Sequence, residues 1–329
     1  MRHLLRRYRT AIGLLTLGLV VLLWLLASCT SLQGAAARNA GFLAWNRSLV
    51  DAGNAAYAVQ AAAALERAAA LGPERASVWR TLGYARLNLN QPEGAVEAWR
   101  NDPRLSRELA GNGQAAQRSG QPDEALAWFQ YATQVAPDDV DAWLDLGAAF
   151  EARGNWQAAV ETYGEGIARA GVPSGDLYFR LARARFNLGW PVDYNAVLNA
   201  ADQALETNRF VHDWSRLQSH YFRGVALQGL GREREALAEF RIVVAERPDD
   251  YWGLVNLGAL IWRLEGDAEA AEGYLRAALA VDSARKPAYL NLAEVYWATG
   301  RRAAAAELYR AVLTIDPADP TANSRLQEE

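Results

Sequence analysis

The chain has 329 residues, a formal net charge of −4 and a single cysteine, Cys29. Residues 1–28 contain four arginines and no acidic residue, so the rest of the chain carries a net charge of −8 (−4 minus 4). An acidic body argues against nucleic acid as a partner, because nucleic-acid binding needs a basic face. A single cysteine excludes an internal disulfide.

The N-terminal segment has the pattern of a secretory signal. Residues 1–9 are basic and residues 11–27 are uncharged and mostly apolar, which is the order of an n-region and an h-region. The stretch Leu26-Ala27-Ser28-Cys29 resembles the lipobox of bacterial lipoproteins, and this resemblance implies that Cys29 is lipidated and becomes the mature N-terminus. The alternative is an uncleaved anchor, because the run is slightly long for a signal h-region, although it is at the short end for a membrane span. In both cases the basic residues keep the N-terminus in the cytoplasm and the following chain outside it.

Beyond a predicted linker at residues 29–41, one pattern recurs about every 34 residues. Its clearest copy, residues 140–173, has two apolar-periodic segments separated by Gly154-Asn155 and is closed by Pro173. The first segments carry an aromatic residue or Leu, then Leu, then Gly or Ala. The second segments carry a small residue followed four places later by a bulky one: Ala95/Trp99, Ala125/Phe129, Ala159/Tyr163, Ala236/Phe240, Ala271/Leu275 and Ala305/Tyr309. Two short helices joined by a turn are predicted, and each pair needs a copy on either side to bury its apolar face.

This pattern resembles the tetratricopeptide repeat (TPR) family. The resemblance implies an all-α fold, a solenoid in which helix-turn-helix repeats form a right-handed superhelix. Eight units are predicted over residues 42–319, the first and fifth being degenerate, and residues 320–329 are predicted as a polar C-terminal tail. In the first unit Trp45 is matched with Trp79, one period later. Extra residues near 208–215 are predicted to form a loop, which either only changes the superhelix or carries function.

In TPR proteins one face of the first helices lines a concave groove, and the resemblance places a partner site there. The residues carried onto that face as the predicted partner groove are Arg80, Tyr84, Phe179, Arg183, Tyr221, Trp252, Trp262, Arg263 and Trp297. Arginine and aromatic residues are the types enriched at interface hot spots. The three tryptophans predict that the main site lies at the C-terminal end. The competing interpretation is that Trp297 packs under the C-terminal tail and Trp262 packs between repeats.

No motif predicts a catalytic or cofactor site. His212 and His220 are interpreted as packed or solvated side chains, because zinc sites need Cys/His clusters and a catalytic triad needs a nucleophile and an orienting acid. The stretch from Gly111 to Ala116 fits a dinucleotide fingerprint only superficially, since it lies inside a helical repeat and follows no strand. We therefore expect no cofactor, no metal and no catalytic residue.

These observations predict a membrane-tethered TPR scaffold that binds a protein or peptide partner in the bacterial cell envelope without catalysis. A second interpretation is an accessory subunit of an envelope polysaccharide or glycosyl-transfer system. An enzyme in its own right is the third interpretation, although the repeats leave no room for a separate catalytic domain. TPR motifs specify a fold and leave the partner open.

Overall fold

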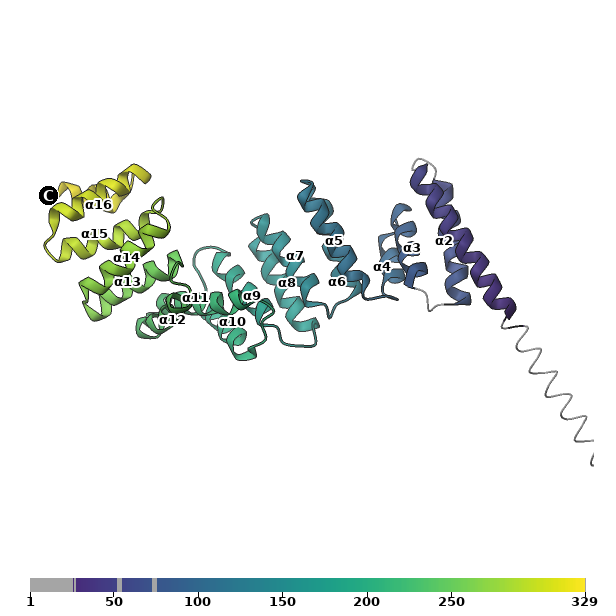
Figure 1. Cartoon of the computed structure of the whole chain (residues 1–329), viewed down its shortest axis with the longest axis horizontal. Coiled ribbons are helices and arrows are strands. Elements are labelled where there is room, and N and C mark those ends of the chain that lie inside the picture. Colours follow the sequence, from purple (N-terminus) through teal and green to yellow (C-terminus); the bar gives the residue numbers. More distant parts are fainter. Residues whose placement is uncertain (1–25, 27, 52–54, 73–75, 329) are drawn as a thin grey trace, which may run out of the picture. The chain divides into compact units, whose positions relative to one another are not determined.

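A computed structural model describes residues 26, 28–51, 55–72 and 76–328, and every regular element in these residues is an α-helix (Figure 1). The chain divides into two units, Met1–Ala142 and Trp143–Glu329. The helices of the first unit are residues 28–50, α2 (Ala55–Leu71), α3 (Ala76–Asn88), α4 (Pro92–Trp99), α5 (Leu105–Arg118) and α6 (Pro122–Val135). The next helix, α7 (Val140–Ala152), begins in the first unit and lies mostly in the second.

The second unit continues the alternation of first and second helices. Its helices after α7 are α8 (Trp156–Arg169), α9 (Gly175–Asn187), α10 (Tyr194–Thr207), α11 (Asp213–Gly229), α12 (Glu233–Glu246), α13 (Tyr251–Glu265), α14 (Ala268–Val281), α15 (Lys286–Ala298), α16 (Arg302–Ile315) and α17 (Pro320–Gln327). Over the described residues the helices form eight consecutive hairpins followed by α17. The predicted all-α repeat fold is therefore confirmed.

The contact that closes each hairpin joins the two positions that recur in the sequence. A Cβ placed on Gly83 would lie 2.0 Å from the indole of Trp99, and one on Gly147 would lie 2.2 Å from the ring of Tyr163. The same relation holds for Gly113 with Phe129, Gly224 with Phe240, and Gly258 with Leu275. These bulky side chains are almost completely buried. Glycine is needed because any side chain there would occupy the space of the ring, and interiors have no room for overpacking.

The turn between α7 and α8 shows why the first helix stops where the sequence predicts. Gly154 has a φ of +69°, a conformation that costs glycine nothing and other residues more. The side chain of Asn155 then accepts a hydrogen bond from the backbone N–H of Ala158 at 3.2 Å. This is an N-cap that satisfies one of the free donors at the start of α8.

The first hairpin differs from its prediction in both start and register. Residues 29–41, predicted as a linker, lie within the helix of residues 28–50, because the alanine-rich sequence favours a helix. A Cβ on Gly41 would lie 2.6 Å from Leu65, so Gly41 takes the closing position of this hairpin. Trp45 follows one turn later and stacks against Tyr84 with ring centroids 6.5 Å apart. The match of Trp45 with Trp79 is therefore wrong.

The insertion before α11 folds back onto the start of α9. The carbonyl of Arg209 accepts from the N–H of Gly175 at 2.8 Å, and the carboxylate of Asp176 accepts from the N–H of Val211 at 2.8 Å. The ring of Phe210 lies against Gly175, where a Cβ would come within 2.6 Å of it. The extra residues are thus held by main-chain and carboxylate hydrogen bonds within the second unit.

The C-terminal residues predicted as a polar tail form the helix α17 up to Gln327. The side chain of Asp319 caps this helix, accepting from the N–H groups of Thr321 and Ala322 at 3.1 Å each. Ala322 is fully buried, so α17 packs onto the last repeat as a cap. None of the helices in the described part of the chain is long and apolar enough to cross a membrane, and residues 1–25 and 27 of the predicted signal segment lie outside that part.

Candidate partner-binding surfaces

In the first unit, two predicted groove residues meet at one carboxylate. Arg80 pairs with Glu108 of α5 at 3.0 Å. The Tyr84 hydroxyl donates to the other oxygen of Glu108 at 3.0 Å and accepts from the side-chain amide of Asn112 at 3.0 Å. Burial, reinforced by the negative charge of Glu108, raises the pKa of Tyr84 to about 12. Tyr84 therefore stays a neutral hydrogen-bonded phenol at physiological pH.

An aromatic cluster surrounds Tyr84. Its ring lies 5.2 Å from Trp99 and 6.2 Å from Trp128, and Trp128 lies 5.8 Å from Tyr131. Trp99 is fully buried, whereas Trp45, Trp128 and Tyr131 are half-buried. Sequence reasoning did not place Trp128 here, because it lies on the second helix α6. The signal that could have found it is the early break after Trp99, which ends α4 after only eight residues.

In the second unit, Arg183 is held on a buried carboxylate. Glu151 of α7 accepts from Arg180 at 3.2 Å and from Arg183 through both of its own oxygens. Glu151 is 9% exposed, and two arginines supply the pairing that a buried charge requires. Phe179 is only 1% exposed, so its prediction as a groove residue is wrong. Trp214, at the end of the insertion, packs edge-on against Phe179 at 5.2 Å and covers it.

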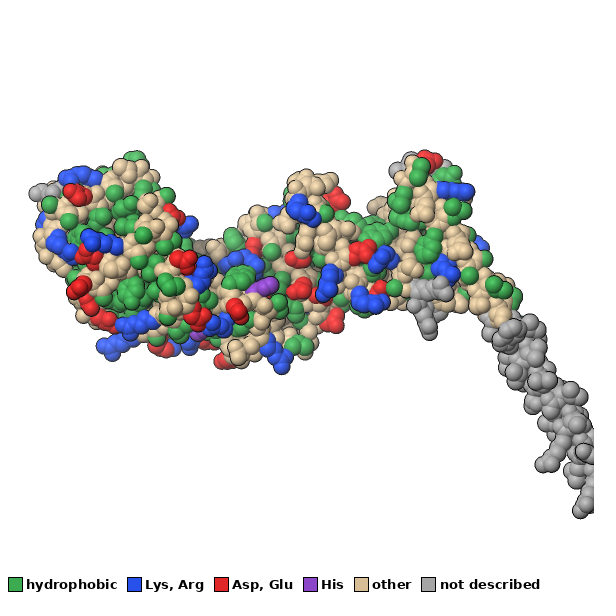
Figure 2. Space-filling view, viewed as in Figure 1, with side chains coloured by type: hydrophobic (Ala, Val, Ile, Leu, Met, Phe, Trp, Pro, Cys, Tyr) green, Lys and Arg blue, Asp and Glu red, His purple; other side chains and the backbone are tan. Residues whose placement is uncertain are grey.

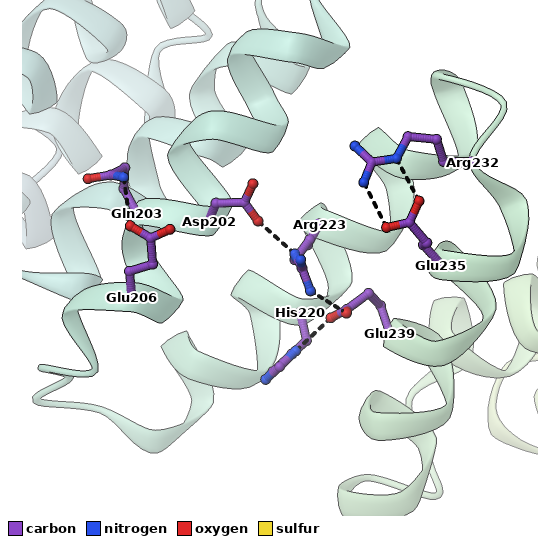
Figure 3. A network of polar contacts seen from close by, with 8 residues as sticks. All are labelled: Asp202, Gln203, Glu206, His220, Arg223, Arg232, Glu235 and Glu239. Atoms are coloured by element: carbon purple, nitrogen blue, oxygen red, sulfur yellow. Dashed lines mark hydrogen bonds and ion pairs between the residues drawn. The ribbon is translucent and has the colours of Figure 1, made fainter.

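A second buried carboxylate joins α10, α11 and α12 (Figure 3). Glu239 accepts from Arg223 at 2.6 Å and contacts the Nδ1 atom of His220 at 2.7 Å, and Arg223 also donates to Asp202 at 2.6 Å. His220 is therefore a packed, hydrogen-bonded side chain. Across the described residues no group of His, Cys, Asp and Glu is arranged to hold a metal ion.

Tyr221, the neighbour of His220, lies largely within the packing of α11 and α12. Its ring is 5.3 Å from Phe222 and 6.0 Å from Phe240, and the residue is half-buried. Burial, with the charge of Asp250, raises the pKa of Tyr221 to about 12. Only part of this predicted groove residue is available to a partner.

The helix α13 presents the most accessible of the predicted aromatic groove residues. Trp252 is 40% exposed, lies 5.1 Å from Tyr251 and has the guanidinium of Arg285 over its ring at 5.6 Å. Trp262 is half-buried, and the exposed Arg263 pairs with Glu233 at 3.1 Å. Trp252 is thus held between two neighbours while a large part of its ring faces solvent.

Trp297 is covered by the C-terminal cap. The guanidinium of Arg302 lies 3.7 Å and that of Arg325 4.9 Å from the ring centroid. Arg325, from α17, is held there by two hydrogen bonds to Glu294 at 3.0 and 3.2 Å. The prediction that Trp297 contributes an open ring to the groove is therefore wrong. The contact with Arg325 favours the competing interpretation, in which Trp297 packs under the C-terminal residues.

Charges of both signs are interspersed within each unit on the face shown in Figure 2, and hydrophobic side chains lie between them. Two family models, both described as Tetratricopeptide repeat, match residues 111–176 and 263–327. The repeats of these two segments are therefore of the tetratricopeptide type. TPR units generally bind protein partners through the surface that stacked repeats create, and the fold is typically a non-catalytic scaffold.

Solved structures of TPR type have the same fold at low sequence identity. A structure of PilF from Pseudomonas aeruginosa matches with a TM-score of 0.58 and 13% identity, covering 69% of this chain and 98% of PilF. PilW, described as a widely conserved type IV pilus biogenesis factor, matches with a TM-score of 0.54 and 16% identity, covering 68% of this chain and 98% of PilW. The Cut9–Hcn1 complex of the APC/C matches with a TM-score of 0.54 and 17% identity, covering 82% of this chain and 52% of the matched chain.

Proposed function

We propose that this protein is a membrane-tethered TPR scaffold that binds a protein or peptide partner in the bacterial cell envelope. The observation that carries the proposal is the exposed ring of Trp252 on a first helix, with Trp262 and Arg263 on the same helix. A large aromatic side chain that is held by its neighbours and still open to solvent is the usual anchor of a protein interface.

The arginines on the first helices favour a partner segment with acidic or carbonyl groups. Arg263 and Arg183 are each positioned by a carboxylate, so less side-chain freedom is lost when a partner contacts them. A guanidinium has five N–H donors, so each arginine keeps donors beyond those that bind its carboxylate. We infer that the partner is an extended peptide or a loop carrying an apolar or aromatic side chain next to an acidic one.

The envelope location rests on the sequence before the array. The lipobox-like stretch ends at Cys29, which is exposed in the structure, and the basic and apolar segments precede it. The similarity to PilF and PilW at the level of the fold supports an envelope role. Cys29→Ala should abolish lipid labelling and leave the precursor unprocessed. Intact mass spectrometry that finds wild-type protein starting at an unmodified Met1 would contradict lipidation and favour an uncleaved anchor.

Partner binding is tested by affinity capture from detergent-solubilised membranes with the wild type, Trp252→Ala and Trp190→Ala. Trp190 is a matched control because it is 86% exposed and lies in the turn between α9 and α10. We expect proteins bound by the wild type to be retained by Trp190→Ala and lost by Trp252→Ala. Equal retention by both variants would contradict the proposed surface. A captured glycosyltransferase would instead support an accessory role in polysaccharide synthesis.

A further inference from the structure

The helix of residues 28–50 carries an unusual concentration of exposed apolar side chains. Of the sixteen large hydrophobic residues that are exposed in the described part of the chain, five lie within residues 26–50: Leu26, Leu32, Leu43, Leu49 and Val50. The only charged residues within 28–50 are Arg38 and Arg47, and the first acidic residue of the chain is Asp51. A helix at the end of a repeat array normally presents a polar outer face, and this one does not.

The exposed residues follow a coiled-coil spacing. Alternating steps of four and three residues define an exposed line made of Leu32, Ala36, Asn39, Leu43, Asn46 and Val50, all of which are exposed. At 100° per residue the four apolar members fall within roughly 40° of one another. A repeat of this kind, sustained over almost three heptads, is the pattern by which helices pair.

The exposed line lies on the side of the helix that has no neighbour among the residues that the structure describes. Gly34 and Gly41 face α2, where Cβ atoms would lie 3.2 Å from Leu71 and 2.6 Å from Leu65. These glycines are roughly 160–180° around the helix from Leu43. In Figure 1 this helix, coloured purple, ends the row of helices of the first unit, so its outer side is open.

We propose that the exposed line is the interface with a second copy of this chain, which pairs in parallel through residues 32–50. In a parallel pair each residue meets its own counterpart, so Leu43 meets Leu43 and the asparagines meet each other. An interface of this kind is self-complementary by symmetry. Asparagine at such positions specifies register and the number of helices, because its amide is satisfied only by another amide in register.

The low charge of the helix also favours a second copy as the occupant. Two arginines in 23 residues provide little attraction to anionic lipid headgroups, which require a polybasic face. The parallel orientation rests on the proposed membrane tether, which also raises the effective concentration of the two copies. The spacing itself does not depend on the tether.

Disulfide trapping in native membranes tests the interface with the full chain. Leu43→Cys and Val50→Cys lie on the exposed line, whereas Leu49→Cys lies roughly 100° or more away from both on an equally exposed position. In a parallel pair the two copies of residue 43, or of residue 50, come within disulfide distance, about 4.4–6.8 Å between Cα atoms. We expect oxidation to give dimer with both line variants, above the background of the wild type with Cys29, and little with Leu49→Cys.

Four outcomes would overturn the proposal. Equal trapping at positions 43 and 49 would indicate random collision, and no trapping at either would show that the line is free. Absence of trapping together with protection of Leu43→Cys from a water-soluble maleimide would assign the line to the lipid surface. Trapping at residue 43 but not at residue 50 would exclude the parallel orientation. If Cys29 is processed in the same sample, the membrane tether is intact, and the proposed orientation alone is wrong.

A charge variant gives an independent measurement. Leu43→Asp should weaken self-association of the detergent-solubilised chain at least about tenfold in sedimentation equilibrium, because two carboxylates would face each other across the pair. Leu49→Asp should leave it unchanged. Both residues are exposed, so thermal unfolding should be the same in the two variants at concentrations low enough to keep both monomeric. Unchanged association of Leu43→Asp would contradict the interface.

Discussion

The two ends of the repeat array solve the problem of a terminal helix in different ways. At the C-terminus, α17 has only eight residues and is held by charged groups: Lys286 donates to Asp316 and Asp319 at 2.6 and 2.9 Å, and Arg325 binds Glu294. At the N-terminus, residues 28–50 form a long helix with two arginines and no acidic residue. One end is closed by ion pairs within the chain, and the other leaves apolar side chains open.

This difference shows which end of the array has a polar outer face. The C-terminal end meets the requirement that a solenoid end with a polar outer face. The N-terminal end exposes apolar side chains to water unless another molecule covers its outer side. The effect of a substitution at either end can be compared with the effect of one in an interior hairpin, at the contact between a glycine and a ring.

The largest effect is expected in the interior, from Gly147→Trp. The site has no room for even one added atom, since a Cβ would lie 2.2 Å from Tyr163. We expect a loss of about 3 kcal/mol, at the upper end for overpacking, measured by chemical denaturation. Gly34→Ala at the N-terminal end is the matched comparison. Its Cβ would lie 3.2 Å from the Cβ of Leu71, and the better helix propensity of Ala, about 1 kcal/mol, offsets this crowding. Equal losses would remove the distinction between interior and end.

An intermediate effect is expected at the C-terminal end, from Asp319→Ala. The change removes the cap of α17 and one partner of Lys286, and loss of an N-cap costs about 1–2 kcal/mol. Asp316→Ala is the control, because Asp316 binds the same lysine without capping α17. We expect denaturant titrations to show a clearly smaller loss for Asp316→Ala. Equal losses would show that the lysine, rather than the cap, holds this end.

A smaller effect is expected on the stability of the C-terminal end at acidic pH. Hydrogen bonds from Lys286 lower the pKa of both Asp316 and Asp319 below their usual range. A lowered folded-state pKa gives stabilisation that is present above the unfolded value of about 4 and lost as the pH falls through the folded value. The melting temperature should therefore fall further between pH 6 and pH 3 in the wild type than in Lys286→Met. The N-terminal helix has no acidic residue within 28–50, so it adds no such dependence. Identical falls in both proteins would contradict this assignment.

The repeat fold could be predicted from the sequence because the two residues that close a hairpin lie close together in the chain. The small position of each first helix and the bulky position of each second helix, such as Gly147 and Tyr163, are the pair that meets in space. The first unit was assigned in the wrong register because Trp45 lies one period before Trp79. Spacing between two tryptophans cannot show which small residue closes the hairpin, and here it is Gly41.

The groove was predicted less well, since a position on a helix does not reveal what lies over it. Phe179 is covered by Trp214, which reaches it only because the insertion folds back onto α9. Trp297 is covered by arginines from α16 and α17. Trp252 kept an open ring because its neighbours Tyr251 and Arg285 contact only part of it. Such covering contacts depend on side chains that are distant in sequence and carry no periodic signal.

Several hairpins are closed by a buried ring that sits on a glycine of the same hairpin, as in Gly147 with Tyr163, and this has a mechanical consequence. A hairpin closed by an internal contact can open while its neighbours stay folded, as in a chain of linked elements with nearest-neighbour coupling. A tensile force applied along the second unit should therefore lengthen it in discrete steps. Each step would release about 34 residues, or about 120 Å of extended chain, so this part of the protein would act as an extensible spring with a step set by the repeat.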